Sequence, residues 1–128
     1  MKLYLLDAGG AGLVLGIMIV FMIAVIVIEA LIMMLMKYNK AGKAFLDSFL
    51  INLVSLVAGY LIVWVNGDLV LYTSSVILNL LILCVITVAV EFAVLYLLNQ
   101  KHKVSKTFPV SVVMNIASYL VWYLLTEI

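Results

Sequence analysis

Two acidic residues stand inside long apolar stretches of this chain. Glu29 lies in the run 25–34, where it is the one charged residue, and Glu91 lies in the apolar stretch 75–98. A carboxyl group can carry a proton, ligate a cation or accept hydrogen bonds, but an ionised carboxylate is not tolerated against lipid. Both side chains are therefore expected to face a protein interior or a partner, and the elements that place them there decide their chemistry.

A pattern of one phenylalanine followed by three polar residues recurs with the same spacing in two other parts of the sequence. The matching residues are Phe45, Ser48, Asn52 and Ser55 in the first part and Phe108, Ser111, Asn115 and Ser118 in the second. Offsets of 3, 7 and 10 residues fall on one face of a helix, so each set predicts one polar stripe. The two sets are related by a shift of 63 residues, from 45 to 108, and the two glutamates by a shift of 62, from 29 to 91.

These shifts predict a tandem repeat within a single transmembrane domain that spans residues 1–128. Repeat 1 covers about 11–65 and repeat 2 about 75–128. Each copy holds two helices, so both copies have the same orientation in the membrane, and the repeat is parallel with a pseudo-two-fold axis along the membrane normal.

The apolar stretches that carry these residues are long enough to cross a bilayer. They are 13–36, 44–65, 75–98 and 108–128, in a chain of 128 residues that is 69% hydrophobic. A spanning helix needs roughly 20 apolar residues. The predicted fold is an all-α membrane protein, a four-helix bundle built from two helical hairpins.

The polar residues are expected at one depth in that bundle. At a rise of 1.5 Å per residue, each glutamate and each asparagine lies about 12 to 13 Å inward from the nearer loop, with the serines one turn further. Amide groups donate well to carboxyl groups, so Glu29 should bond Asn52 or Asn115, and Glu91 the other. The predicted polar layer consists of Glu29, Asn52, Ser55, Glu91, Asn115 and Ser118.

Charges predict the orientation of the chain. All seven basic residues are lysines, and six of them fall in the two loops that join the helices of each hairpin. The positive-inside rule puts these lysine loops in the cytoplasm and both termini outside, as for a protein of a bacterial inner membrane. The lysines are interpreted as topology determinants in preference to a site for anionic lipid or nucleic acid, and no nucleic-acid partner is expected.

Small residues are expected to pack the helices together. Gly12 and Gly16 continue a small-xxx-small ladder that permits close helix contact, either within the bundle or between protomers. Ser48, Gly59 and Ser111 are assigned the same packing role on their polar stripes. Asp47 is expected to pair with a lysine, and Pro109 is expected in the first turn of the last helix.

Two functions remain open. No nucleophile stands beside a base, two distant glutamates are too few for a metal site, and glycine-rich phosphate loops are absent, so no enzyme activity, cofactor or metal is expected. The first hypothesis is an interaction or assembly subunit whose partners are the lipid bilayer and either further copies or other membrane subunits. The alternative is a small transporter or channel in which Glu29 and Glu91 handle protons or a small cation.

Overall fold

The computed structural model describes residues 8–66 and 75–126, and every element in that part of the chain is helical. The helices are α1 (Ala8–Leu35), α2 (Ala41–Asn66), α3 (Val76–Leu98) and α4 (Val104–Thr126). Each of the four contains a stretch long and apolar enough to cross a membrane. The described chain is therefore all-α with four helices of membrane-spanning length and apolarity, as the sequence predicts.

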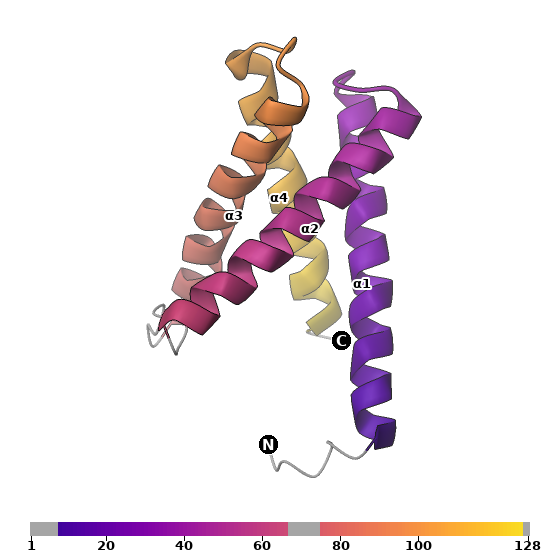
Figure 1. Cartoon of the computed structure of the whole chain (residues 1–128), viewed down its shortest axis with the longest axis vertical. Coiled ribbons are helices and arrows are strands. Elements are labelled where there is room, and N and C mark those ends of the chain that lie inside the picture. The colour runs from indigo at the N-terminus through magenta and orange to yellow at the C-terminus, as the bar shows by residue number, and fades with distance from the viewer. Residues whose placement is uncertain (1–7, 67–74, 127–128) are drawn as a thin grey trace.

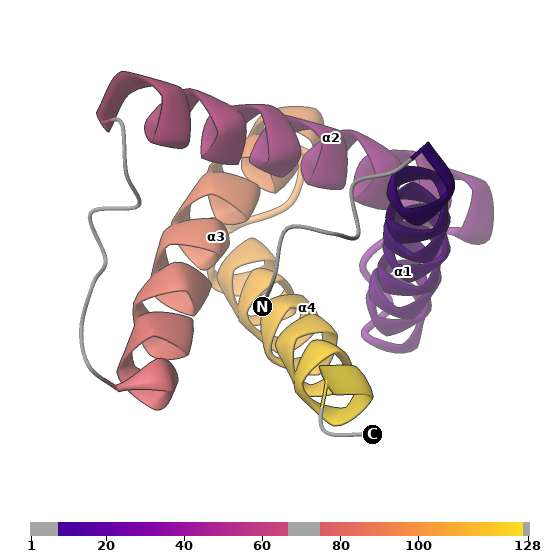
Figure 2. The same ribbon diagram turned by 90° about the horizontal axis from the view of Figure 1, so that it is seen from below.

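The four helices form a ring in which each contacts two neighbours. Helix α1 packs against α2 and α4, and α3 packs against α4 and α2. The loops 36–40 and 99–103 lie at the same end of the molecule, which we call the loop end, and α2 crosses obliquely toward α3 (Figure 1). Viewed from the opposite end, which we call the far end, α1 stands well apart from α3 (Figure 2).

The core lies near the loop end. Its buried apolar residues are Ala30, Met33, Tyr38, Ala44, Ile51, Leu95, Val110 and Met114. By contrast, the nine successive α1 residues from Gly12 to Val20 are all exposed, on every side of the helix. Large exposed side chains also fill the far ends of α2 and α4, such as Tyr60 and Leu124. The helices are thus packed at the loop end and diverge toward the far end.

Helix α1 ends in a turn that fixes the course of the first loop. The N–H of Lys37 donates to the carbonyl of Met34 at 3.0 Å, and the N–H of Tyr38 donates to that of Met33 at 2.8 Å. This pair of bonds is a Schellman motif, which places one residue in the left-handed region. That residue is Lys37, with a φ of 53°. The motif turns the chain so that Tyr38 enters the core.

The start of α4 differs from the sequence expectation. Helix α4 begins at Val104, so Pro109 is the sixth helical residue and lies inside the helix. The expectation that Pro109 occupies the first turn is wrong, because the turn 104–107 before it is already helical. A proline has no N–H, so the carbonyl of Ser105 lacks its usual bond from four residues ahead.

Candidate functional site

Glu29 is the centre of the first half of the buried polar layer. Its side chain is 1% exposed on α1. Its carboxyl oxygens accept hydrogen bonds from Asn52 Nδ2 at 2.5 Å, Ser48 Oγ at 2.8 Å and Ser118 Oγ at 3.0 Å. Asn52 and Ser48 come from α2 and Ser118 from α4, so one carboxyl group ties three helices together.

Glu91 occupies the corresponding place on α3. It is 4% exposed and accepts from Asn115 Nδ2 at 2.7 Å and Ser55 Oγ at 3.2 Å. The predicted pairing of each glutamate with a different asparagine is confirmed. The structure also brings together all six residues of the predicted layer.

The two glutamates share a pattern of partners. Each carboxyl group receives an amide N–H from the other helix of its own hairpin and a hydroxyl from the other hairpin. Hydrogen bonds between membrane helices are worth about 0.6 kcal/mol on average and rarely more than about 1.7 kcal/mol. The bonds from Asn52 and Asn115 join the two helices within each hairpin. The bonds from Ser118 and Ser55 join one hairpin to the other.

Ser48 and Ser111 pack the helices of each hairpin at close range. Both side chains are fully buried. Ser48 Oγ donates to the carbonyl of Ile26 at 3.1 Å, and Ser111 Oγ donates to that of Val88 at 3.3 Å. A hydroxyl that reaches the backbone of the neighbouring helix requires that the two helices approach closely at Ser48 and at Ser111.

The glycines do not pack within the bundle. A Cβ atom built on Gly12, Gly16 or Gly59 meets no atom within 4 Å outside its own helix. Within the single chain, therefore, Gly12, Gly16 and Gly59 make no packing contact with a neighbouring helix, contrary to the intramolecular form of the expectation. The physical reason is the divergence of the helices, because all three glycines lie toward the far end.

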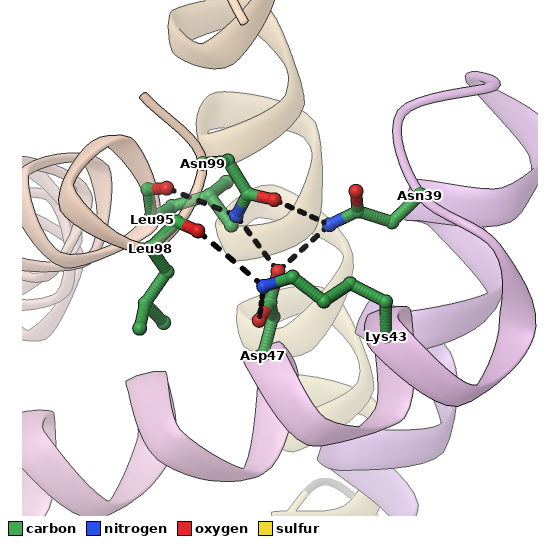
Figure 3. A network of polar contacts seen from close by, with 6 residues as sticks. All are labelled: Asn39, Lys43, Asp47, Leu95, Leu98 and Asn99. Atoms are coloured by element: carbon green, nitrogen blue, oxygen red, sulfur yellow. Dashed lines mark hydrogen bonds and ion pairs between the residues drawn. The ribbon is translucent and has the colours of Figure 1, made fainter. Parts of the chain in front are cut away.

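A second polar network lies at the loop end, around Asp47 (Figure 3). The Asp47 carboxylate is fully buried on α2 and accepts from the side-chain amides of Asn39 and Asn99, each at 2.7 Å. It also forms an ion pair with Lys43 one turn earlier, which confirms the predicted lysine partner. The network joins the first loop, the start of α2 and the end of α3.

The asparagines of this network were missed in the sequence. Asn39 also donates to Asn99 at 3.1 Å, and Asn99 donates to the carbonyl of Leu95 at 3.1 Å. Asn99 is 1% exposed and caps the C-terminus of α3. One signal was present: an asparagine directly after the last apolar residue of a helix is a common terminator. Its burial against Asp47 depends on tertiary packing, which the pattern does not encode.

Tyr38 also joins the two loops. Its hydroxyl shares a hydrogen bond of 2.9 Å with Thr107, and its ring lies 4.3 Å from the ring of His102. The Nζ atom of Lys106 lies 5.9 Å from the same ring. Burial raises the pKa of the Tyr38 hydroxyl, the bond to Thr107 opposes this, and the negative charge of Asp47 adds to it.

The described residues of this site are carboxyl, amide and hydroxyl groups joined by hydrogen bonds. Within 8–66 and 75–126, no three His, Cys, Asp or Glu side chains are grouped as a metal site would require. The hydrogen bonds received by Glu29 and Glu91 all come from neutral groups. No family model, curated protein or solved structure matches the chain.

Proposed function

We propose that this chain is a non-enzymatic assembly subunit of the membrane, in which two tandem hairpins are fastened at the loop end and bind another membrane-spanning chain at the far end. That chain is either a second copy or a different subunit. The observation that carries the proposal is the contrast between the two ends, since α1 buries one face around Glu29 yet is exposed on all sides from Gly12 to Val20.

Corresponding contacts support the tandem repeat. The bond from Ser48 to the carbonyl of Ile26 recurs as that from Ser111 to Val88, at shifts of 63 and 62 residues. The donation of each layer asparagine to the carbonyl four residues earlier recurs as well, at 2.9 Å and 3.0 Å. Two hairpins with the same internal bonds are what duplication of one hairpin would produce.

The polar layer has the features of a fastener. Among the described residues, no buried side-chain nitrogen or oxygen lacks a hydrogen-bond partner. Fully satisfied buried networks select one arrangement of the elements that they join, because any other arrangement would leave polar groups unpaired. In this layer, the bonds of Ser118 and Ser55 define how one hairpin sits on the other.

The far end of α1 offers a surface for close helix contact. Gly12 and Gly16 are spaced by one helical turn, are exposed and meet no atom of another helix. In lipid, helix association depends on close packing at small residues, because apolar surface alone gives no preference for protein over lipid. This surface is therefore suited to a second transmembrane helix.

The experiment is a measurement of assembly size for the full chain. The protein is extracted in mild detergent, and its mass is measured by light scattering together with that of any co-purifying chain. We expect a stoichiometric complex, which the Gly12→Leu, Gly16→Leu double variant weakens. The matched control is Val14→Leu with Met18→Leu, on the opposite side of α1, where both side chains are already large and exposed. A monomer without partners, or equal weakening by both variants, contradicts the proposal.

The same assignment includes the orientation that the lysines favour. The loop end would face the cytoplasm and both termini the outside of a bacterial inner membrane, because basic loops are retained on the cytoplasmic side. A single cysteine placed at Gln100, in a chain with Cys84→Ala, tests this by labelling intact cells with a membrane-impermeant maleimide. Labelling of Gln100→Cys from outside would contradict this orientation and indicate the opposite one.

A second candidate function is the handling of protons or a small cation by the glutamates. It is favoured by one observation: the two carboxyl groups are electrostatic neighbours, and only neutral groups donate to them. Flux of protons or monovalent cations into liposomes that contain the purified protein tests it. Flux that Glu29→Gln and Glu91→Gln abolish would replace the assembly proposal, and no flux would remove this candidate.

A further inference from the structure

The two lysine loops form one surface, although they lie about 60 residues apart in the chain. Lys106 Nζ donates to the carbonyl of Lys37 at 3.0 Å, and the rings of Tyr38 and His102 are 4.3 Å apart. These contacts hold loop 36–40 against loop 99–103. We call the surface the lysine face, and its residues are Lys37, Lys40, Lys43, Lys101, Lys103 and Lys106.

The lysine face carries positive charge that the described residues do not balance. Five of its six lysines are exposed, and among the residues that the structure describes only Lys43 forms an ion pair, with Asp47. The acidic residues that the structure describes are Glu29, Asp47 and Glu91, and all three are buried. No acidic side chain among them therefore reaches the surface beside the lysines.

The depth of the lysine face in the membrane determines which molecules it can contact. Lys37 lies two residues beyond the apolar span that ends at Leu35, and Lys103 directly precedes the span that begins at Val104. Lysines at the ends of membrane helices extend their apolar stems along the protein and place their ammonium groups at the lipid headgroups. The face is thus held at headgroup level by four spanning helices.

We propose that the lysine face binds the phosphate groups of anionic phospholipids in the leaflet that it borders. Phosphates surround the loop end at the depth of the ammonium groups, whereas an acidic protein would have to displace them. Each lysine near an anionic membrane surface strengthens attraction by roughly fivefold in affinity, and salt screens that attraction. This inference concerns the loop end alone and does not depend on the far-end assembly proposed above.

Spin-labelled lipids measure the binding directly. The full chain is reconstituted in phosphatidylcholine vesicles that contain a trace of spin-labelled phosphatidylglycerol or, in parallel, spin-labelled phosphatidylcholine. Electron spin resonance gives the fraction of each lipid that the protein immobilises. We expect a severalfold preference for phosphatidylglycerol at low salt that shrinks toward equality in 0.5 M NaCl, as screening over a few ångströms requires.

The variants use exposed lysines whose side chains form no hydrogen bond or ion pair in the described structure. The triple variant Lys40→Gln, Lys101→Gln, Lys103→Gln should lose the preference, and the charge-conserving triple Lys40→Arg, Lys101→Arg, Lys103→Arg should keep it. Circular dichroism confirms that both remain helical. Equal immobilisation of the two lipids by the wild type, or an unchanged preference in the glutamine triple, would overturn the proposal. An acidic protein partner for the face would then be the reading to pursue.

Discussion

Ser118 on α4 donates a hydrogen bond of 3.0 Å to Glu29 on α1, across 89 residues of chain. Ser55 on α2 makes the corresponding bond to Glu91 on α3 at 3.2 Å. In the first bond the second hairpin supplies the donor, and in the second bond the first hairpin does. Each hairpin thus supplies one carboxyl group and one hydroxyl to the interface. Both bonds therefore restrain how one hairpin sits on the other.

Removal of one hydroxyl should loosen the interface between hairpins. We expect Ser118→Ala to lower the free energy of unfolding by about 0.6 to 1.5 kcal/mol, because Glu29 loses a donor in a buried, low-dielectric site. Reversible unfolding by dodecyl sulfate, followed by circular dichroism, measures it. Ser105→Ala on the same helix is the control, since Ser105 is exposed.

A double-mutant cycle tests the pairing itself. Ser118→Ala combined with Glu29→Gln should show a coupling energy of several tenths of a kcal/mol, as residues in contact do. The combination with Glu91→Gln should be close to additive, because Ser118 bonds the other glutamate. Equal coupling of Ser118 to Glu29 and to Glu91 would contradict the pairing of Ser118 with Glu29.

Asp47 should be the most sensitive residue of the loop end. Asp47→Ala removes the acceptor that the buried amide of Asn99 shares with Asn39, and it leaves the Asn99 amide only the carbonyl of Leu95. We expect a loss of about 1 to 3 kcal/mol in unfolding free energy. The lysine contributes little of this, because its side chain is 39% exposed and screened by solvent. Asp47→Asn should lose less, since it keeps one carbonyl acceptor. Thermal unfolding in detergent ranks the two variants, and a harmless Asp47→Ala would refute the network.

Lys37 offers a stabilising substitution. Its φ of 53° is unfavourable for a side chain with a Cβ atom, whereas glycine adopts it freely. We expect Lys37→Gly to raise the unfolding free energy by up to about 1 kcal/mol, since the Schellman turn uses only its backbone. Lys40→Gly, at a residue without a positive φ, serves as the comparison and should give no gain. A loss of stability in Lys37→Gly would contradict the turn geometry.

Tyr38 should make stability depend on alkaline pH. Because burial raises its pKa in the folded state, the folded protein holds the phenol proton more tightly than the unfolded chain does. Its contribution is complete below the ordinary tyrosine pKa of about 10 and is lost as the pH rises through the folded pKa. The difference in unfolding free energy between wild type and Tyr38→Phe should therefore be constant to about pH 9 and fall above about pH 10. A difference that stays flat above about pH 10 would disprove the assignment.

Helix positions and the polar layer were predictable because both follow from local rules. The lengths of the apolar stretches predicted four helices, and each predicted end lies within five residues of the observed one. The largest difference is at the start of α1, which was predicted at Leu13 and is observed at Ala8. The layer followed from depth along the helix and from the hydrogen-bonding capacity of asparagine and glutamate. Once the helices are side by side, Glu29 and Asn52 have few other partners at their level.

The errors lie where packing between distant segments decides. Gly59 was expected at a helix contact because it continues the Asn52 stripe, but a stripe does not reveal that the helices diverge below it. Asn39 and Asn99 were passed over because each looks like an ordinary loop residue until the fold brings it to Asp47. Pro109 was placed at a helix start by its preference for first turns, yet α4 already begins at Val104.

The divergence of the helices has a mechanical consequence for the bilayer. In a bilayer, a protein that is packed where Met33 and Leu95 are buried and spread where Leu13 and Leu124 are exposed would take up unequal area in the two leaflets. Lipids around such a wedge would be compressed on one side and spread on the other. Its insertion would therefore be coupled to membrane curvature, and bending of the bilayer would act back on the distance of α1 from its neighbours.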